Sequence, residues 1–245
     1  MAMNRTVLIT GGTKRIGLAI TQYLHKNGYN VIVTFNKSQT NAKKISSDLN
    51  KKRENSCSII QIQLSDTKSY KMLYKKALSF FGRVDALVNN ASQFYPTKIN
   101  QIDEKRWGGI IDTNLKAPLF LSKVFYPELK KRKGQIINII DIHVDPPLKN
   151  HIIYSISKSG LLTLTKSLAK ELAPDVRVNG ISPGAILWPT FEKNLKRKKD
   201  IISKIPLKRT GKPEDIAKAV KFLIEDGQYI TGQNINIDGG RKLNM

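Results

Sequence analysis

The sequence predicts a single α/β domain built on a doubly wound sheet of seven parallel strands flanked by helices. Three observations point to this class. Short β-branched runs alternate with longer segments of helical periodicity along the 245 residues. The strand-like runs are almost continuously apolar, which is typical of parallel strands covered by helices on both faces. The length suits one domain, 1–245, and no internal repeat, low-complexity tract or linker divides the chain.

Seven strands are expected, each a short run rich in Val and Ile. In chain order they are TVLIT (6–10), VIVTF (31–35), SIIQIQ (58–63), DALVNN (85–90), QIINII (135–140), RVNGI (177–181) and NINID (234–238).

Helix-length segments lie between these strands. In the first of them, RIGLAITQYLHKNG, Ile16, Ile20, Tyr23 and Leu24 fall on one face, and Gly28 stands where a helix C-terminal glycine belongs. The alternation of such helices with apolar strands implies a parallel sheet covered on both faces.

Three loops follow strands at their C-terminal ends and are long enough to carry function. They span 92–102, 141–151 and 182–212. Ligands of an open parallel sheet bind at that edge, so the functional residues are expected there.

Composition excludes several classes of protein. With 40% hydrophobic and 25% charged residues the chain can build a core, so wholesale disorder is excluded. The single cysteine, Cys57, excludes internal disulfides, and no Cys/His cluster has the spacing of a metal site. No run approaches about 18 apolar residues, and the N-terminus resembles a first strand more than a signal peptide. We therefore expect a soluble, cytoplasmic enzyme or binding protein with no membrane partner and no metal.

The chain is strongly basic, with 42 Lys+Arg against 19 Asp+Glu and a net charge of +23. Residues 190–212 hold nine Lys or Arg and two acids, and KKRKG at 130–134 forms a second cluster. The remaining charge is scattered, which favours no specific nucleic-acid partner. Either the basic surface is simply solvated, or it attracts anionic small molecules.

A glycine-rich turn, TGGTKRIG at 10–17, joins the first strand to the first helix. Glycines there let the backbone approach a pyrophosphate, and the helix N-terminus offers free N–H groups, so dinucleotide binding is expected. An acidic residue at the end of the second strand would bind the ribose hydroxyls of NAD, but Asn36, Lys37 and Ser38 stand there. With Arg15, Lys37 and Ser38 can hold a 2′-phosphate, which favours NADPH over NADH, unless Lys37 is an ordinary surface lysine.

Tyr154 and Lys158 stand four residues apart at the start of a long apolar-periodic segment. On a helix they share a face. The pKa of an unperturbed tyrosine, about 10, is too high for fast proton exchange at neutral pH, and an adjacent ammonium would lower it. The pair therefore predicts a tyrosine general acid whose lysine could also hold a cofactor ribose.

Six separated motifs resemble the short-chain dehydrogenase/reductases over essentially the whole chain. In order they are TGGTKRIG, NNAS (89–92), Asn114, YSISK (154–158), SPG (182–184) and ITGQNINIDGG (230–240). The resemblance implies a Rossmann-type sheet, a nicotinamide cofactor and a homotetramer built through long helices around 103–130 and 152–172. It also implies that Tyr154 donates the proton, that Lys158 supports it and binds the nicotinamide ribose, and that Asn114 holds a water in the relay.

The cofactor contacts that this resemblance implies include one departure from the family. Many members have an aspartate beside the adenine, where this chain has Gln63 and Leu64; glutamine can still hydrogen-bond an adenine amino group, so altered strength is expected. The expected cofactor positions are Gly11, Thr13, Lys14, Arg15, Ile16, Asn36, Lys37, Ser38, Gln63, Leu64, Asn90, Ala91, Ser92, Tyr154, Lys158, Pro183, Gly184 and Ile186.

Three further departures resemble a narrower group, the pteridine reductases. The middle glycine of the family turn is Arg15, the Asn-rich motif continues as NNASQFYPT, and the residue thirteen before the tyrosine, usually a catalytic serine, is Asp141. The segment PGAILWP at 183–189 fits the same group. The resemblance implies a pterin or folate substrate bound by Arg15, Ser92, Phe94, Asp141 and Tyr154.

The chemistry of a pterin agrees with these residues. A flat ring with a 2-amino-4-oxo edge needs an aromatic platform, which Phe94 can supply, and polar groups, which Ser92 and Asp141 can supply. Arg15 could bridge the pterin oxygen and the cofactor phosphates. An ionised Asp141 would raise the pKa of Tyr154 and keep the phenol protonated, which favours reduction over alcohol oxidation.

The expected reaction is hydride transfer from NADPH to a pterin ring carbon, with protonation of the adjacent nitrogen. Tyr154 and Lys158 would serve the step from dihydropterin to tetrahydropterin, and Asp141 would relay a proton when a fully oxidised pterin is reduced. The basic stretch overlaps a substrate lid expected near 185–212, where it could admit the anionic tail of a folate or be solvated helix surface.

Two alternatives stay open. The chain could be a carbonyl or 3-oxoacyl reductase of the same family, whose basic patches receive an acidic carrier protein. It could also be a non-catalytic nucleotide-sensing or polyanion-binding protein on the same fold. His25, His143 and His151 are scattered and carry no predicted role, although the last two fall near the proposed site.

Overall fold

Seven parallel strands form one sheet in the order β3-β2-β1-β4-β5-β6-β7 in the computed structural model, which describes residues 4–188 and 194–245. The strands from β1 to β3 are added toward one edge of the sheet, and the strands from β4 to β7 are added toward the other edge. The strand order therefore reverses between β1 and β4, which is the doubly wound arrangement. All seven predicted strands are confirmed, and their ends shift by at most two residues. The strands are β1 Thr6–Ile9, β2 Asn30–Phe35, β3 Cys57–Gln61, β4 Ala86–Asn89, β5 Gln135–Ile139, β6 Arg177–Pro183 and β7 Asn234–Ile237.

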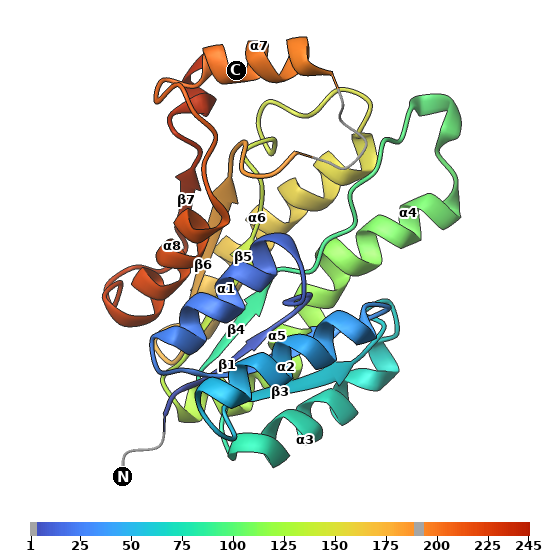
Figure 1. Cartoon of the computed structure of the whole chain (residues 1–245). Helices are drawn as coiled ribbons and strands as arrows, with labels where there is room; N and C mark the ends of the chain where they lie inside the picture. The colour runs from blue at the N-terminus through green and yellow to red at the C-terminus, as the bar shows by residue number, and fades with distance from the viewer. Residues whose placement is uncertain (1–3, 189–193) are drawn as a thin grey trace.

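Helices cover both faces of this sheet (Figure 1). The α-helices are α1 Arg15–Lys26, α2 Gln39–Lys52, α3 Tyr70–Phe81, α4 Glu104–Ile111, α5 Ala117–Lys131, α6 Ile152–Leu172, α7 Leu195–Lys204 and α8 Pro213–Glu225. A π-helical segment, η3 Asp112–Lys116, joins α4 to α5, and short 3-10 turns are η1 Thr67–Ser69, η2 Ile99–Gln101 and η4 Arg241–Asn244.

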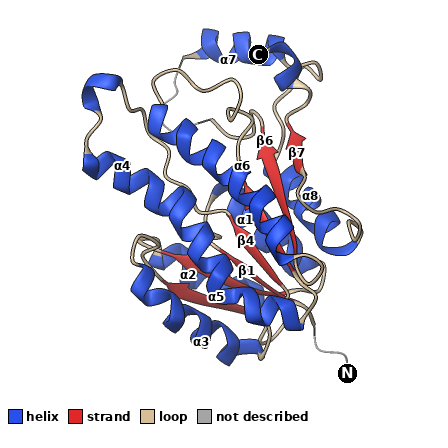
Figure 2. Cartoon of the chain, turned by 180° about the vertical axis from the view of Figure 1, so that it is seen from behind, coloured by secondary structure: helices blue, strands red, loops and turns tan. Residues whose placement is uncertain are grey.

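Alternate side chains of each central strand enter two different hydrophobic clusters. In β1, Val7 and Ile9 pack with residues of α1, α2 and α8, whereas Leu8 packs with residues of α3, α5 and α6. Figures 1 and 2, seen from opposite sides, show these two helical layers. Because both faces of the sheet are covered, side chains on either face of a central strand are buried. Complete burial of a leucine or isoleucine stabilises the fold by roughly 1.5–3 kcal/mol, which explains why these strands are almost continuously apolar.

Helix ends follow local sequence signals. Gly28 has φ +89° just beyond α1, as predicted for a C-terminal glycine, and His25 and Lys26 lie in the last turn, where positive charge is favourable. Pro213 begins α8, and the carboxylate of Asp215 accepts a hydrogen bond from the backbone N–H of Lys212 at 2.8 Å. These signals fix where the helices start and stop, and therefore where the loops at the carboxyl edge begin.

The long helix expected around 103–130 is interrupted, because the π-helical segment η3 separates α4 from α5. Helix α7 lies beyond the carboxyl ends of β6 and β7 (Figure 1), and none of its residues is buried. None of the helices in the described part of the chain is long and apolar enough to cross a membrane.

Candidate active site

The residues predicted to bind cofactor and substrate gather at the carboxyl edge of the sheet. They follow the ends of β1 to β6 or lie in the first two turns of α6. This placement agrees with the rule that ligands of open parallel sheets bind at that edge. Within the described residues, no group of three or more His, Cys, Asp or Glu side chains could hold a metal ion.

Asp141 and Tyr154 form the centre of the candidate site. The phenol of Tyr154 donates a hydrogen bond to Oδ2 of Asp141 at 2.6 Å. The other carboxylate oxygen accepts from the backbone N–H of His143 at 2.8 Å, and the hydroxyl of Ser182 donates to the carbonyl of Asp141 at 3.1 Å. Tyr154 is 5% exposed. The loop after β5 therefore holds the carboxylate in a fixed orientation toward the phenol.

The pKa of Tyr154 is raised well above its ordinary value. Burial of the phenol is the main cause, followed by the charge of Asp141 and the hydrogen bond to it. The direction agrees with the predicted effect of a carboxylate at 141. It differs from the other prediction, that the ammonium of Lys158 lowers this pKa, because burial and the carboxylate set the direction of the shift.

Lys158 lies one helical turn after Tyr154 and is 2% exposed. Its Nζ donates to the carbonyl of Ile139 at 2.8 Å and lies 5.8 Å from the centroid of the Tyr154 ring. Burial lowers the pKa of Lys158 to about 8, and the charge of Asp141 opposes this shift. The amine is therefore fixed beneath the tyrosine ring by the end of β5.

Asn114 is fully buried in the π-helical segment η3. Its Oδ1 accepts from the backbone N–H of Gln93 at 2.8 Å, and its Nδ2 donates to the Gln93 carbonyl at 3.0 Å and to Oγ of Ser157 at 3.1 Å. π-helical turns are frequent at functional sites. The amide thus ties the loop after β4 to α6, and the predicted water relay through Asn114 stays a prediction.

Phe94 stands beside the phenol. Its ring meets that of Tyr154 edge-on, with centroids 4.8 Å apart and an interplanar angle of 80°. It stacks on His151 with centroids 4.8 Å apart and an angle of 14°. The predicted platform residue is therefore adjacent to the candidate proton donor, and a histidine supports it from behind.

The sequence placed His143 and His151 near the site but gave neither of them a role. His151 stacks on Phe94, and its Nδ1 lies 2.9 Å from the carbonyl of Lys149. Burial lowers the pKa of His143, whose backbone N–H holds Asp141. No spacing signal joins Phe94 to His151, because the contact spans 57 positions and depends on the bridge between Thr97 and His151.

The glycine turn after β1 leaves no room for a side chain at Gly12 or Gly17. A Cβ on Gly17 would lie 2.4 Å from the carbonyl oxygen of Gly11 and 2.5 Å from Nδ2 of Asn90. Gly11 has φ +64°, and Nδ2 of Asn90 donates to the carbonyls of Thr10 and Gly11 at 2.9 and 3.1 Å. The predicted glycine turn and the NNAS motif therefore form one unit. The absence of side chains at its glycines would let a pyrophosphate approach the backbone closely.

The end of β2 reaches the same turn. The hydroxyls of Thr13 and Ser38 lie 2.8 Å apart, and Ser38 stands at the N-terminus of α2 without a side-chain cap bond. Lys37 is exposed beside it. The structure thus places Lys37 and Ser38, two of the three residues expected to hold a 2′-phosphate, beside the glycine turn.

Arg15 differs from expectation. It adopts φ +53°, and its guanidinium donates to the carbonyls of Leu187 at 3.1 Å and Trp188 at 3.3 Å. The sequence predicts a bridge from Arg15 to a pterin oxygen and cofactor phosphates, whereas the structure links Arg15 to the chain that follows β6. The lid expected near 185–212 includes residues 189–193, which lie outside the described residues.

The other predicted positions lie at the same edge with fewer contacts. Nε2 of Gln63 donates to Ser65 at 2.9 Å, and Oγ of Ser92 is 3.5 Å from the Gln93 carbonyl. Gly184 packs against Asp238, since a Cβ on it would lie 2.6 Å from the Asp238 Cα. Lys14 and Ser92 are exposed, Ile16, Asn36 and Leu64 are exposed or half-buried, and Ala91, Pro183 and Ile186 line the ends of β4 and β6.

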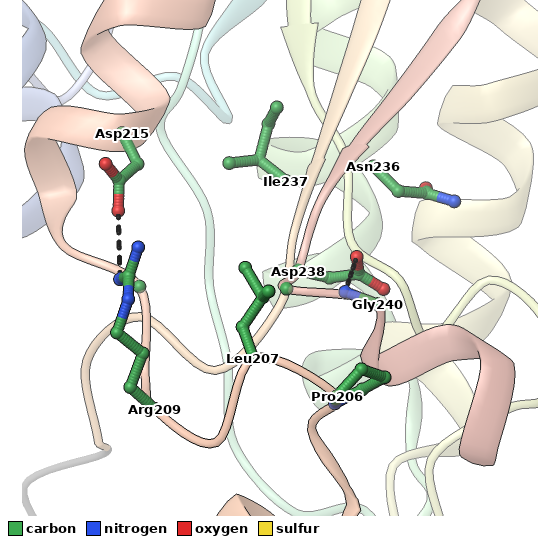
Figure 3. Close-up of a pocket in the computed structure, with 10 residues that line it drawn as sticks. Pro206, Leu207, Arg209, Asp215, Asn236, Ile237, Asp238 and Gly240 are labelled. Carbon is green, nitrogen blue, oxygen red and sulfur yellow. Dashed lines mark hydrogen bonds and ion pairs between the residues drawn. The ribbon is translucent and has the colours of Figure 1, made fainter.

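A hollow of about 510 Å³ lies between the segment joining α7 to α8 and the end of β7 (Figure 3). Arg209 and Asp215 form an ion pair at 3.8 Å on one side of it, and Oδ1 of Asp238 accepts from the backbone N–H of Gly240 at 2.9 Å. None of its lining residues belongs to the predicted catalytic set, so this hollow is separate from the Tyr154 centre.

The fold, the glycine turn and the Tyr154–Lys158 pair define a nicotinamide-dependent oxidoreductase. A family model described as enoyl-(acyl carrier protein) reductase matches residues 11–242. The chain belongs to the short-chain dehydrogenase/reductase family, whose members use NAD(P)(H).

Curated relatives extend over the whole chain. A 3-oxoacyl-(acyl-carrier-protein) reductase of Staphylococcus aureus is 35% identical and covers 98% of this chain and 99% of its own length. The corresponding protein of Staphylococcus epidermidis is 36% identical, covering 97% and 99%. Pteridine reductase 1 of Leishmania tarentolae is 32% identical, covering 96% of each chain. By overall identity the comparisons favour the 3-oxoacyl alternative, and pterin specificity is not confirmed.

Proposed function

We propose that this protein is an NADPH-dependent reductase of pterins, acting on dihydropterins and also on oxidised pterins or folates. The observation that carries the proposal is the hydrogen bond from Tyr154 to the carboxylate of Asp141, beside the ring of Phe94. Substrate choice depends on the groups that line a site more than on identity averaged over a fold.

The carboxylate of Asp141 discriminates between the two substrate classes. A carboxylate only accepts hydrogen bonds, so it complements the amino and ring N–H groups of a pterin. A 3-oxo group offers only an acceptor, and its oxygen gains negative charge during reduction. At a separation of about 4 Å and an effective dielectric constant of 20, the negative charge on this oxygen and the charge of the carboxylate repel by about 4 kcal/mol. Asp141 therefore favours the pterin.

The residues at the nucleotide end fit NADPH. The crowded glycine turn at Gly17 keeps the backbone open to a pyrophosphate, and the missing acid at the end of β2 removes the group that would select NAD. Lys37, Ser38 and the uncapped N-terminus of α2 would hold the 2′-phosphate. When bound, the cofactor would supply the hydride.

The chain's own residues then control the proton. Tyr154 stays protonated because burial and Asp141 raise its pKa, so it can donate a proton to the substrate at neutral pH. Lys158, held by the Ile139 carbonyl, would bind the nicotinamide ribose and orient the phenol. Asp141 would relay a proton when a fully oxidised pterin is reduced, and Phe94, supported by His151, would lie against the flat ring.

A 3-oxoacyl reductase is the second candidate, because the relatives with the higher identities carry that name. In this case the basic residues of 195–212 would receive an acidic carrier protein. The lid near 185–212 and a homotetramer formed through α4, α5 and α6 belong to either proposal. Light scattering of the purified protein tests the tetramer.

One assay separates these functions. Oxidation of NADPH is measured with dihydrobiopterin, dihydrofolate and a 3-oxoacyl thioester side by side, and repeated with NADH. Pterin-dependent turnover with a preference for NADPH supports the proposal. Turnover on the thioester alone replaces it with the second candidate, and inactivity on all three substrates favours a non-catalytic nucleotide-binding protein.

A further inference from the structure

A cationic hollow of about 160 Å³ lies at the amino-terminal edge of the sheet. Five basic residues line it, Arg5, Arg83, Arg132, Lys133 and Arg177, together with one carboxylate, Asp85. Asp141 stands six residues after Gln135, the first residue of β5, and a strand rises about 3.3 Å per residue. The hollow and the candidate active site are therefore roughly 20 Å apart, at opposite ends of β5.

Two of the five cations are neutralised by carboxylates. Arg83 forms an ion pair with Asp85, in which Nε donates to Oδ2 at 2.9 Å. Nε of Arg132 donates to Glu128 at 2.7 Å. The other three basic residues of the hollow are Arg5, Lys133 and Arg177.

The remaining cations are under-compensated. Arg5 interacts electrostatically with Glu225, but Lys133 and Arg177 have no carboxylate partner among the described residues. Arg177 is half-buried, and its guanidinium donates to the carbonyl of Gly227 at 2.8 Å. Burial and the nearby charge of Arg5 lower the pKa of Arg177. Partly buried like charges are unfavourable without a counter-ion, so an anion placed between them would stabilise this edge.

A buried amide in the wall also lacks a partner. Gln135 lines the hollow, is 3% exposed, and its Oε1 has no hydrogen-bond partner among the described residues. An anion that carries a hydroxyl group can donate to this oxygen, while its other oxygens accept from guanidinium and ammonium groups. Inorganic phosphate, which keeps a P–OH group at neutral pH, and a singly protonated phosphate monoester have both kinds of oxygen.

We propose that this hollow is a phosphoryl-binding site, in which Lys133 and Arg177 hold the anion and Gln135 accepts its hydroxyl. The volume is sufficient for the five heavy atoms of a phosphate, since a liquid water occupies about 30 Å³. Arginine forks match phosphate oxygens in pairs, and lysine adds a point charge. The ligand is either free phosphate or the phosphate of a monoester.

Titration calorimetry of the full chain with inorganic phosphate, at constant ionic strength, tests the site. One phosphate per chain is expected. Lys133→Gln and Arg177→Gln should each raise the Kd about tenfold, because each removes one charge-assisted contact. Lys133 is exposed, so its variant is expected to fold normally. A parallel titration with glycerol phosphate identifies the source, since tighter binding than free phosphate indicates a monoester.

Two matched variants remove one positive charge elsewhere. Lys76→Gln lies on the exposed face of α3, and Lys51→Gln lies on the exposed face of α2. Both should leave the Kd for phosphate within about twofold. The proposal is overturned if phosphate does not bind, if all four variants weaken its binding equally, or if Lys133→Gln and Arg177→Gln leave its Kd unchanged. Binding of an acidic peptide at Lys133 and Arg177 without binding of phosphate would also overturn it.

Discussion

At the scale of single residues, the hydroxyl of Tyr154 has one hydrogen-bond partner in the described structure, the carboxylate of Asp141 at 2.6 Å. A phenol held in this way stays protonated at neutral pH, because its pKa is raised. Under the proposed function, the proton needed for reduction is therefore kept on Tyr154 by burial and by the carboxylate of Asp141.

Tyr154→Phe should lower the turnover number about 10²- to 10⁴-fold, the usual contribution of a general acid. Cofactor affinity should stay unchanged, because the phenol hydroxyl contacts Asp141 and not the glycine turn. Steady-state rates and fluorescence titration with NADPH measure the two quantities. Equal turnover in the variant would remove Tyr154 from the mechanism.

Asp141→Ser should lower the rate of pterin reduction, because the variant loses the charge that helps keep the phenol protonated and the acceptor that we propose for the substrate. Its alkaline loss of activity should also begin at a lower pH, since the pKa of Tyr154 falls toward its ordinary value. Rates from pH 6 to 10 check both effects. Faster pterin reduction, or efficient alcohol oxidation with reduction intact, would contradict this role of Asp141.

Lys158→Met tests whether the buried ammonium makes the stability of the protein depend on pH. The pKa of Lys158 is about 8 in the folded protein against an ordinary 10.5, so between these values the unfolded chain holds a proton that the folded protein has released. The free energy of unfolding of the unmodified protein therefore rises with pH across this window. The raised pKa of Tyr154 acts in the opposite direction, but only above about pH 10.

In Lys158→Met this rise should be absent, and stability at pH 7 should increase by about 1–2 kcal/mol, because a buried charge is removed while the Ile139 carbonyl loses its donor. Urea unfolding at pH 7 and pH 9.5 measures the difference, with Lys76→Met as an exposed control. A pH slope equal to that of the unmodified protein would contradict the expectation.

At the scale of elements, the turn between β1 and α1 and the loop after β4 work as one unit. Gly17→Ala should destabilise the protein by more than about 2 kcal/mol and abolish NADPH binding, because its methyl group would overlap backbone at Gly11 and the amide of Asn90.

Gly108→Ala in α4 is the matched control. The nearest atom to its Cβ would be a carboxylate oxygen of Asp112 at 3.8 Å, and alanine favours a helix by about 1 kcal/mol over glycine. Thermal unfolding should therefore show a neutral or stabilising change. A Gly17→Ala variant as stable as Gly108→Ala would mean that the turn can relax.

Elements were predictable from sequence to the extent that their signals are local. Every strand was expected within two residues of its observed ends, because both faces of the sheet are covered and the runs are apolar. The π-helical segment at Asn114 had no such signal. It coincides with a tertiary contact, in which the amide of Asn114 binds Gln93 and Ser157.

At the scale of the whole molecule, a net charge of +23 makes the folded chain repel itself. Stability should rise as NaCl increases from about 0.02 to 0.5 M, because the Debye length shortens from roughly 20 Å to less than 5 Å. Thermal unfolding in NaCl measures this effect. Phosphate at equal ionic strength should stabilise further if the amino-edge hollow binds it, and a melting temperature independent of NaCl would show that the charges are already compensated.

The sequence alone determined the sheet and the glycine turn and predicted the Tyr154–Lys158 pair, because hydrophobic periodicity, glycine and spacing along a helix are short-range properties. Asp141 was predicted from the resemblance to the family. Only the tertiary structure decided that the Tyr154 pKa is raised, that Arg15 binds the chain after β6, and that His151 supports Phe94. It also gathered Lys133 and Arg177 around one hollow. Each of these depends on residues far apart in the chain, whose distance and burial exist only after folding.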